Sequence, residues 1–365
     1  MPKARRRVRI KTPPLLFDAT QRVIARIQRS VEGAFLTYWT STSGSVCDND
    51  VMALHELLES LGPQKQLTLF VKSDGGSGMA SLRLVHLMRR YAKRVTVLAP
   101  LNCASAATML ALGADTIQMG PLSFLTAVDT SLEHDLSPLD HTNNLVAVSH
   151  DEVERVIRLW KETGRGTGVN PYQELYKYLH PLVIGALDRA SSLSLMLCRE
   201  ILGYHMKDAK KIERISRRLN SSYPAHQYPI TSREARALGL DVKDLDPILD
   251  GLLQELNLLY SEMGQRAITD YDELNHHDNE ITNILEGRGL QVFYQVEKDW
   301  HYRKEERRWV PMNDVSAWYK SRRKAGRVIK TKFHIREAKT RNEPCQRAER
   351  DSLPRSERGV WGVRR

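Results

Sequence analysis

The stretch LNCASAATMLALGAD, residues 101–115, decides the fold of this chain. The β-branched segment VTVLAP comes just before it and is typical of a buried strand, whereas SAATMLALGA is rich in helix-forming residues. This change of residue type predicts a strand that gives way to a short helix. Ser105 lies at the change, with its hydroxyl at the start of the helix. A serine at this place acts either as a helix cap or as a nucleophile.

The apolar run from Val95 to Ala114 contains no charged residue and is close to the length that a bilayer requires. Pro100 and Asn102 interrupt the run, and its two halves favour different secondary structures. We therefore expect two short buried elements and no membrane span. The basic start of the chain is followed by no apolar segment, so a secretory signal is not expected either.

The chain has 365 residues, enough for two or three domains and at least one sizeable core. Its four cysteines are widely separated and form no CxxC pair, which indicates neither a disulfide framework nor a zinc site. This cysteine usage favours the reducing cytoplasm. No metal and no other cofactor is expected.

Helices and strands are predicted to alternate around the opening stretch. Residues 48–62 begin with Asx capping residues, repeat leucines at helical spacing and stop at a glycine, so they predict a helix. The sequence QLTLFV, residues 66–71, predicts a buried strand that runs through the turn KSDGGSG into a second helix at 79–94. Further strands are expected near TIQMG and FLTAVD. The alternation predicts an α/β fold.

Two features at the ends of neighbouring predicted strands suit acyl transfer. A diglycine turn, Gly75 and Gly76, brings backbone N–H groups close to a substrate without an intervening side chain. Ala106 supplies another free N–H at the start of the Ser105 helix. A serine nucleophile needs such donors for the oxyanion that develops on the attacked carbonyl.

The sequence from about Ala34 to Leu256 resembles the serine dehydrogenase proteinase family, in the clan of Clp proteolytic subunits, the signal peptide peptidase SppA and crotonases. The segments that carry the likeness are LHELLESLG, LTLFVKSDGGSGMASLRLVHLMRRYAKRVTVLAPLNCASAATMLALGADTIQMGPLS, HPLVIGALDRASSLSLMLCREIL and HQYPITSREARALGLDV. The resemblance implies a crotonase-like (ClpP-like) spiral of ββα units and homo-oligomeric assembly. It also implies a nucleophile at Ser105 and oxyanion donors at Gly75, Gly76 and Ala106.

The chain departs from the family pattern at two positions. Asp74 stands where relatives have proline, and it brings a negative charge near the expected oxyanion site. Ala107 stands where relatives have glycine, so a methyl group there would crowd a substrate strand or alter the turn.

The general base has several candidates. Clp subunits carry a histidine about 25 residues after the serine, but here the comparable place holds Asp129. His226 lies in a segment that resembles the region of the triad aspartate in Clp subunits. We therefore expect a permuted triad in which His226 takes the proton of Ser105 and Asp129 holds the imidazole. Lys161, in a position like that of the SppA lysine, and His180 are the alternative bases.

Positive charge is concentrated at the end of the sequence. Residues 301–365 contain 20 Lys and Arg against 8 Asp and Glu. Together with scattered aromatic residues, this charge suits either nucleic acid or an acidic partner. This tail lies outside the resemblance, and we expect its removal to leave the α/β core folded.

Three regions are expected: a basic arm at 1–30, a ClpP/crotonase-like serine protease domain at 31–265 with additional helices at its C-terminal end, and a basic extension at 266–365. The helix predicted from Pro181 to Leu202 is apolar around most of its circumference, which favours homo-oligomerisation. Cover by the later helical segments of the same chain is the alternative.

The function expected from these features is that of a serine peptidase-like hydrolase, independent of ATP within this chain and acting on a peptide or protein substrate. The alternative is an inactive crotonase-like oligomeric scaffold whose basic tail binds nucleic acid or an acidic partner.

Overall fold

The computed structural model describes residues 9–129, 131–132, 134–141, 145–163 and 170–334. The helices are α1 Phe17–Ser30, α2 Asp48–Leu61, α3 Gly78–Tyr91, α4 Ala106–Leu112, α5 His150–Thr163, α6 Pro171–Leu175, α7 Pro181–Gly203, α8 Ala209–Ser221, α9 Ser232–Leu238 and α10 Pro247–Met263. The strands up to α10 are β1 Ala34–Thr40, β2 Gln64–Lys72, β3 Ala92–Ala99, β4 Asn102–Cys103, β5 Thr116–Met119, β6 Phe124–Leu125, β7 Ser131–Leu132, β8 Val148–Ser149 and β9 Val242–Asp244. After α10 come β10 Ala267–Asp270, β11 Asn275–Gly287, β12 Leu290–Arg303, β13 Arg308–Asp314, β14 Ala317–Lys324 and β15 Arg327–Lys332.

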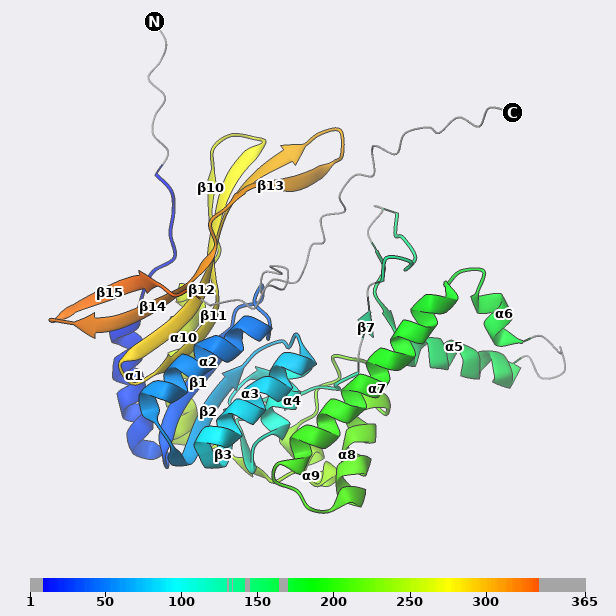
Figure 1. Ribbon diagram of the computed structural model, residues 1–365, viewed down its shortest axis with the longest axis horizontal. Helices are drawn as coiled ribbons and strands as arrows, with labels where there is room; N and C mark the ends of the chain where they lie inside the picture. Colours follow the sequence, from blue (N-terminus) through cyan, green and yellow to red (C-terminus); the bar gives the residue numbers. More distant parts are fainter. Residues whose placement is uncertain (1–8, 130, 133, 142–144, 164–169, 335–365) are drawn as a thin grey trace, which may run out of the picture.

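One large mixed sheet organises the chain (Figure 1). Strands β1, β2, β3, β5 and β9 run parallel, as expected for an α/β fold whose strands are joined by helical crossovers. The sheet continues from the other edge of β1 through β11, β12, β14 and β15, which are antiparallel to their neighbours. The predicted α/β class is confirmed.

The two faces of the sheet are buried by different helices. Alternate side chains of the first strands, such as Leu36 and Val71, pack with α2, α3 and α4 in the larger core. The intervening side chains, such as Phe35 and Phe70, pack with α1 and α10 in a second core. Because both faces are covered, the parallel strands are apolar along most of their length.

The helix and strand predictions around Ser105 hold with small shifts of boundary. The apolar run that a membrane span would have used forms β3, β4 and α4 instead. The helix expected over 79–94 ends at Tyr91, because β3 already begins at Ala92. The strand expected at FLTAVD is short and covers only Phe124–Leu125.

Helix α7 is long and apolar enough, by length and composition alone, to cross a membrane. This is weak support for a span, because core helices of globular proteins share both properties. Here α7 packs against α3, α4 and α8, with Leu197 and Ile201 buried. On its outer side Leu182 and Met196 are 62% and 53% exposed, so α8 covers α7 only in part.

Removal of residues 301–365 was expected to leave the α/β core folded, but the structure places part of this segment in the core. Strand β12 extends to Arg303, and β14 pairs with it inside the main sheet. Trp318 of β14 is only 4% exposed and belongs to the larger core. Removal of residues 301–365 would therefore strip core contacts. The high content of Lys and Arg is the reason that these strands were not predicted from the sequence. Residues 335–365 of the expected extension lie outside the described residues. The division of the chain at residue 266 stays a prediction.

Strand β11 carries a buried carboxyl group, Glu286, between the sheet and the α1/α10 layer. The Thr20 hydroxyl and the Gln21 amide donate to its Oε1, each at 2.7 Å. The Tyr260 hydroxyl and the Gln291 amide donate to Oε2 at 2.8 and 2.7 Å. Burial raises the pKa of Glu286 to about 7, against the effect of these four donors.

This raised pKa predicts a pH-dependent stability. The native state keeps the proton of Glu286 over a range in which the unfolded chain has released it, so the free energy of unfolding falls as the pH rises from about 4.5 to about 7. A shift of this size corresponds to roughly 3 kcal/mol. We expect Glu286→Gln to show a smaller fall than the wild type in urea unfolding at pH 5 and 7.5. Glu273→Gln, at an exposed site, is the matched control, and equal falls in all three proteins would contradict the prediction.

Candidate active site

Three loops that follow parallel strands are joined by backbone hydrogen bonds. The N–H of Val46 donates to the carbonyl of Gly75 and the N–H of Ser77 donates to the carbonyl of Val46, both at 2.8 Å. The N–H groups of Ser73 and Ala104 link the second loop to the third at 3.0 Å each. These bonds hold the diglycine turn beside the start of α4.

Gly75 is required by this close approach. Its φ is +107°, which residues with a side chain rarely adopt. A Cβ at this position would lie 2.6 Å from the Cβ of Ser105 and 2.9 Å from the carbonyl oxygen of Ala104. Gly76, with φ +145°, is equally confined, since its Cβ would meet the carbonyl oxygen of Val46 at 2.4 Å. These distances agree with the prediction that the diglycine turn allows a close approach of the backbone.

Ser105 occupies a strained backbone conformation, with φ 52° and ψ −117°. It stands between β4 and α4, so the chain turns sharply from strand to helix at this residue. Its side chain accepts no capping hydrogen bond from α4. A strained serine at a sharp strand-to-helix turn is the geometry that exposes the nucleophilic hydroxyl in α/β-hydrolases.

Two threonines hold the Ser105 turn. The N–H of Ser105 donates to Oγ1 of Thr126 at 2.8 Å. The N–H of Thr126 donates to Oγ1 of Thr108 at 3.1 Å, and the Thr108 hydroxyl donates to the carbonyl of Cys103 at 2.7 Å. All these groups are buried or half-buried. Sequence reasoning missed both threonines, because their residue type and spacing form no recognisable pattern.

His226 and Asp129 form a hydrogen-bonded pair, with Nδ1 of the imidazole 2.7 Å from Oδ1 of the carboxylate. The two residues come from loops 97 positions apart in the sequence. The side chain of Asp129 is 17% exposed and that of His226 is 42% exposed. A carboxylate at Nδ1 fixes the imidazole orientation and leaves Nε2 on the opposite side of the ring.

Ser105, Asp129 and His226 line one pocket of about 300 Å³. The turn residues Gly76 and Ala106 also line it, and α7 forms a wall that the sequence did not lead us to expect. Most of the other side chains that line the pocket are apolar: Met79, Met109, Val128, Ala190, Leu193 and Leu197. The structure thus brings the three residues of the expected triad to a single cavity, and their catalytic roles stay predictions.

The backbone donors around the pocket differ in their availability. The N–H of Gly75 is buried and donates to the Ser73 hydroxyl at 3.2 Å. Within the described part of the chain, the N–H groups of Gly76 and Ala106 donate to no protein acceptor. Of the three expected oxyanion donors, Gly76 and Ala106 are therefore the two available for a ligand.

The alternative bases lie away from the pocket lining. Lys161 is exposed on α5 and lines a different surface hollow with Asp151 and Arg158. His180 is exposed at the start of α7, where its Nδ1 accepts the N–H of Leu182 at 3.2 Å. His180 thus caps a helix.

The two departures from the family pattern are accommodated locally. The Asp74 carboxylate accepts a hydrogen bond from the side-chain amide of Asn102. Burial lowers the pKa of Lys72, and the negative charge of the nearby Asp74 acts in the opposite direction. Ala107 is fully buried in the larger core and is not part of the pocket lining, so its methyl group faces away from the cavity.

The comparison with known families agrees with this geometry. Residues 27–121 match the Clp protease family model. The matched range contains the diglycine turn and Ser105, but ends before Asp129 and His226. No curated protein matches the chain significantly. The match supports a place in the clan of Clp proteolytic subunits and crotonases, and a serine peptidase-like function at that level. The match does not test the narrower resemblance to the serine dehydrogenase proteinase family.

The contacts of Thr126 generate a prediction about the serine turn. Thr126→Val removes the acceptor of the Ser105 N–H and leaves that buried donor unpaired, which costs about 1–3 kcal/mol. We expect the variant to react with a fluorophosphonate probe at least tenfold more slowly than the wild type. Thr126→Ser keeps the hydroxyl and is the control. Equal rates for Val and Ser would show that the hydrogen bond does not position Ser105.

Proposed function

We propose that this protein is a serine-type hydrolase that cleaves peptide bonds, with Ser105 as its nucleophile. The observation that carries the proposal is the strained Ser105 conformation, φ 52° and ψ −117°, in a pocket shared with the His226–Asp129 pair. A purely structural helix cap needs neither a left-handed backbone nor a neighbouring histidine held by a carboxylate.

The proposed reaction follows from these groups. Nε2 of His226 takes the proton of the Ser105 hydroxyl as Oγ attacks the substrate carbonyl. Asp129 holds the imidazole through Nδ1 and stabilises its charged form. The N–H groups of Gly76 and Ala106 stabilise the oxyanion, each being worth about a hundredfold or more in rate. His226 then protonates the leaving amine, and water releases the acyl group by the same steps in reverse.

A fluorophosphonate probe tests the proposal directly, because it reacts with activated serines. The wild type is expected to be labelled, whereas Ser105→Ala is not. Ser192→Ala, an exposed change on α7, is the matched control and is expected to be labelled normally. Since loss of a triad base costs several orders of magnitude, His226→Gln is expected to lose labelling at an unchanged melting temperature.

Other outcomes have definite meanings. Retained labelling in His226→Gln with loss in Lys161→Ala or His180→Gln would transfer the role of base to that residue. Absence of labelling in the wild type at every pH between 6 and 9 would contradict the hydrolase and favour the alternative, an inactive crotonase-like scaffold.

We further propose that the protein is a cytoplasmic homo-oligomer. The support for assembly is the apolar outer side of α7, where Leu182 and Met196 are exposed although α3, α4 and α8 pack against other parts of the helix. Light scattering on dilute protein without a tag is expected to give a mass several times 41.8 kDa. A mass of one chain throughout the micromolar range would contradict assembly.

A further inference from the structure

The hairpin formed by β14 and β15 is the last part of the described chain and lies at the end of the main sheet (Figure 1). Its two-residue turn, Ala325 and Gly326, has φ values of 49° and 78°. Positive φ at both positions is characteristic of the type I′ turn, which closes a tightly twisted two-stranded ribbon. Every residue from Arg322 to Lys332 is exposed. The outer half of the hairpin is thus an exposed ribbon, although Val328 and Ile329 are only 38% and 37% exposed.

The charge of this ribbon is of one sign. Between Ala317 and Lys332 the sequence contains seven Lys and Arg and no Asp or Glu. Contacts with the body of the protein engage the residues nearest to it: Lys320 pairs with Glu56, and Lys330 donates to Oε1 of Gln295 at 2.6 Å. These contacts fix the base of the hairpin on the sheet.

Three of the four cations nearest the turn lack an acidic partner in the described part of the chain. Arg323 forms an ion pair with Asp18 of α1. In the described part of the chain, Arg322, Lys324 and Arg327 have no acidic partner within salt-bridge distance. The tip therefore presents three uncompensated cations within six residues of sequence.

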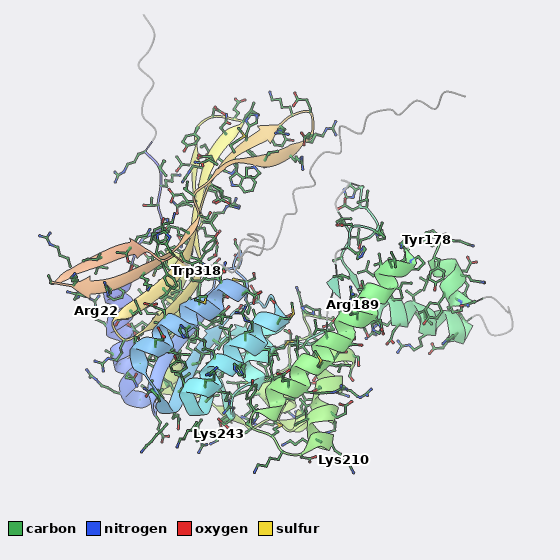
Figure 2. The ribbon with its side chains drawn as sticks, in the orientation of Figure 1. Arg22, Tyr178, Arg189, Lys210, Lys243 and Trp318 are labelled. Carbon is green, nitrogen blue, oxygen red and sulfur yellow. The ribbon has the colours of Figure 1, made fainter. Side chains whose placement is uncertain are left out.

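Helix α1 adds one exposed cation, Arg22, near the hairpin. The Arg323–Asp18 ion pair brings this end of the helix against the hairpin. Arg22 is one helical turn further along α1 and is exposed. Figure 2 shows it on the side of the molecule from which the hairpin projects.

We propose that the β14–β15 hairpin binds double-stranded DNA by entering the major groove. The groove is about 12 Å wide and admits a two-stranded β-ribbon. The residue pairs nearest the turn are Arg322↔Ile329, Arg323↔Val328 and Lys324↔Arg327, a length of about 10 Å at ~3.4 Å per pair. The groove is about 8.5 Å deep, so the ribbon reaches its floor while the flanking cations meet phosphates on both sides.

The same features separate duplex DNA from other nucleic acids. Single strands are held largely by base stacking on exposed aromatic rings, and residues 322–332 contain none. Duplex RNA has a deep and narrow major groove that does not admit a ribbon. An acidic protein shares only the charge complementarity. The inference is independent of the proposed hydrolase, because the hairpin and the Ser105 pocket share no residue.

The test is fluorescence anisotropy with the full chain and a labelled 20-base-pair DNA duplex at several salt concentrations. The variant Arg322→Gln/Lys324→Gln/Arg327→Gln alters only exposed side chains. We expect it to bind about tenfold or more weakly at 100 mM salt. The slope of log K against log salt is expected to become shallower by about 2 to 3, since each phosphate contact contributes about 0.9.

A matched control replaces three exposed cations elsewhere, Arg189, Lys210 and Lys243, with glutamine (Figure 2). It removes the same net charge and is expected to keep affinity and slope near those of the wild type. Ser105→Ala is expected to bind DNA normally. Because the whole chain is used, binding by residues outside the hairpin is common to all variants.

Three results would overturn the proposal. The first is equal weakening in the hairpin variant and the control, which would indicate attraction by net charge alone. The second is an affinity for duplex RNA of the same sequence equal to that for DNA. The third is displacement of DNA by polyglutamate at an equal concentration of charge, which would indicate an acidic protein partner. A large effect confined to the hairpin variant and to duplex DNA supports it.

Discussion

The close contact between the diglycine turn and the start of α4 is the constraint on which the candidate site depends. Hydrogen bonds join the loops after β1, β2 and β3 so closely that a side chain at Gly75 would not fit. With Thr126 holding its N–H, Ser105 is then kept in a conformation that it would not adopt alone. The parallel sheet beneath maintains the strain. Among the residues that the structure describes, the N–H groups of Gly76 and Ala106 have no protein acceptor.

The sequence predicted the first half of the fold because its patterns are simple there. Buried parallel strands read as apolar runs, and α2 and α3 have leucines at helical spacing, so the position of Ser105 between strand and helix was evident. The pairing of His226 with Asp129 came from family resemblance, since no spacing rule joins loops 97 residues apart. Thr126 was not predicted, because a threonine that accepts one backbone hydrogen bond has no signature in sequence.

The second half of the sheet escaped prediction for a physical reason. Strand β11 is buried but polar, with Asn283 and Glu286 on opposite sides of its backbone. The Asn283 amide donates to Asp50, and four donors surround Glu286. The polar side chains of β11 are thus buried because they are hydrogen-bonded. For this reason the sequence of the strand shows neither an apolar run nor an alternating pattern. In β14 and β15, the abundance of Lys and Arg predicted a basic extension outside the core, so the burial of Trp318 was not expected.

The pairing of β1 with β11 also governs the order in which the chain can fold. Thr37 lies opposite Glu286, so β1 gains its second neighbour from a segment almost 250 residues further along the sequence. During synthesis the ribosome adds about 5–20 residues per second, and β1 therefore spends many seconds as an open edge. Such an edge is a template for wrong strand pairing until β11 arrives. The contacts that close the centre of the sheet join distant parts of the sequence, and such long-range contacts slow folding.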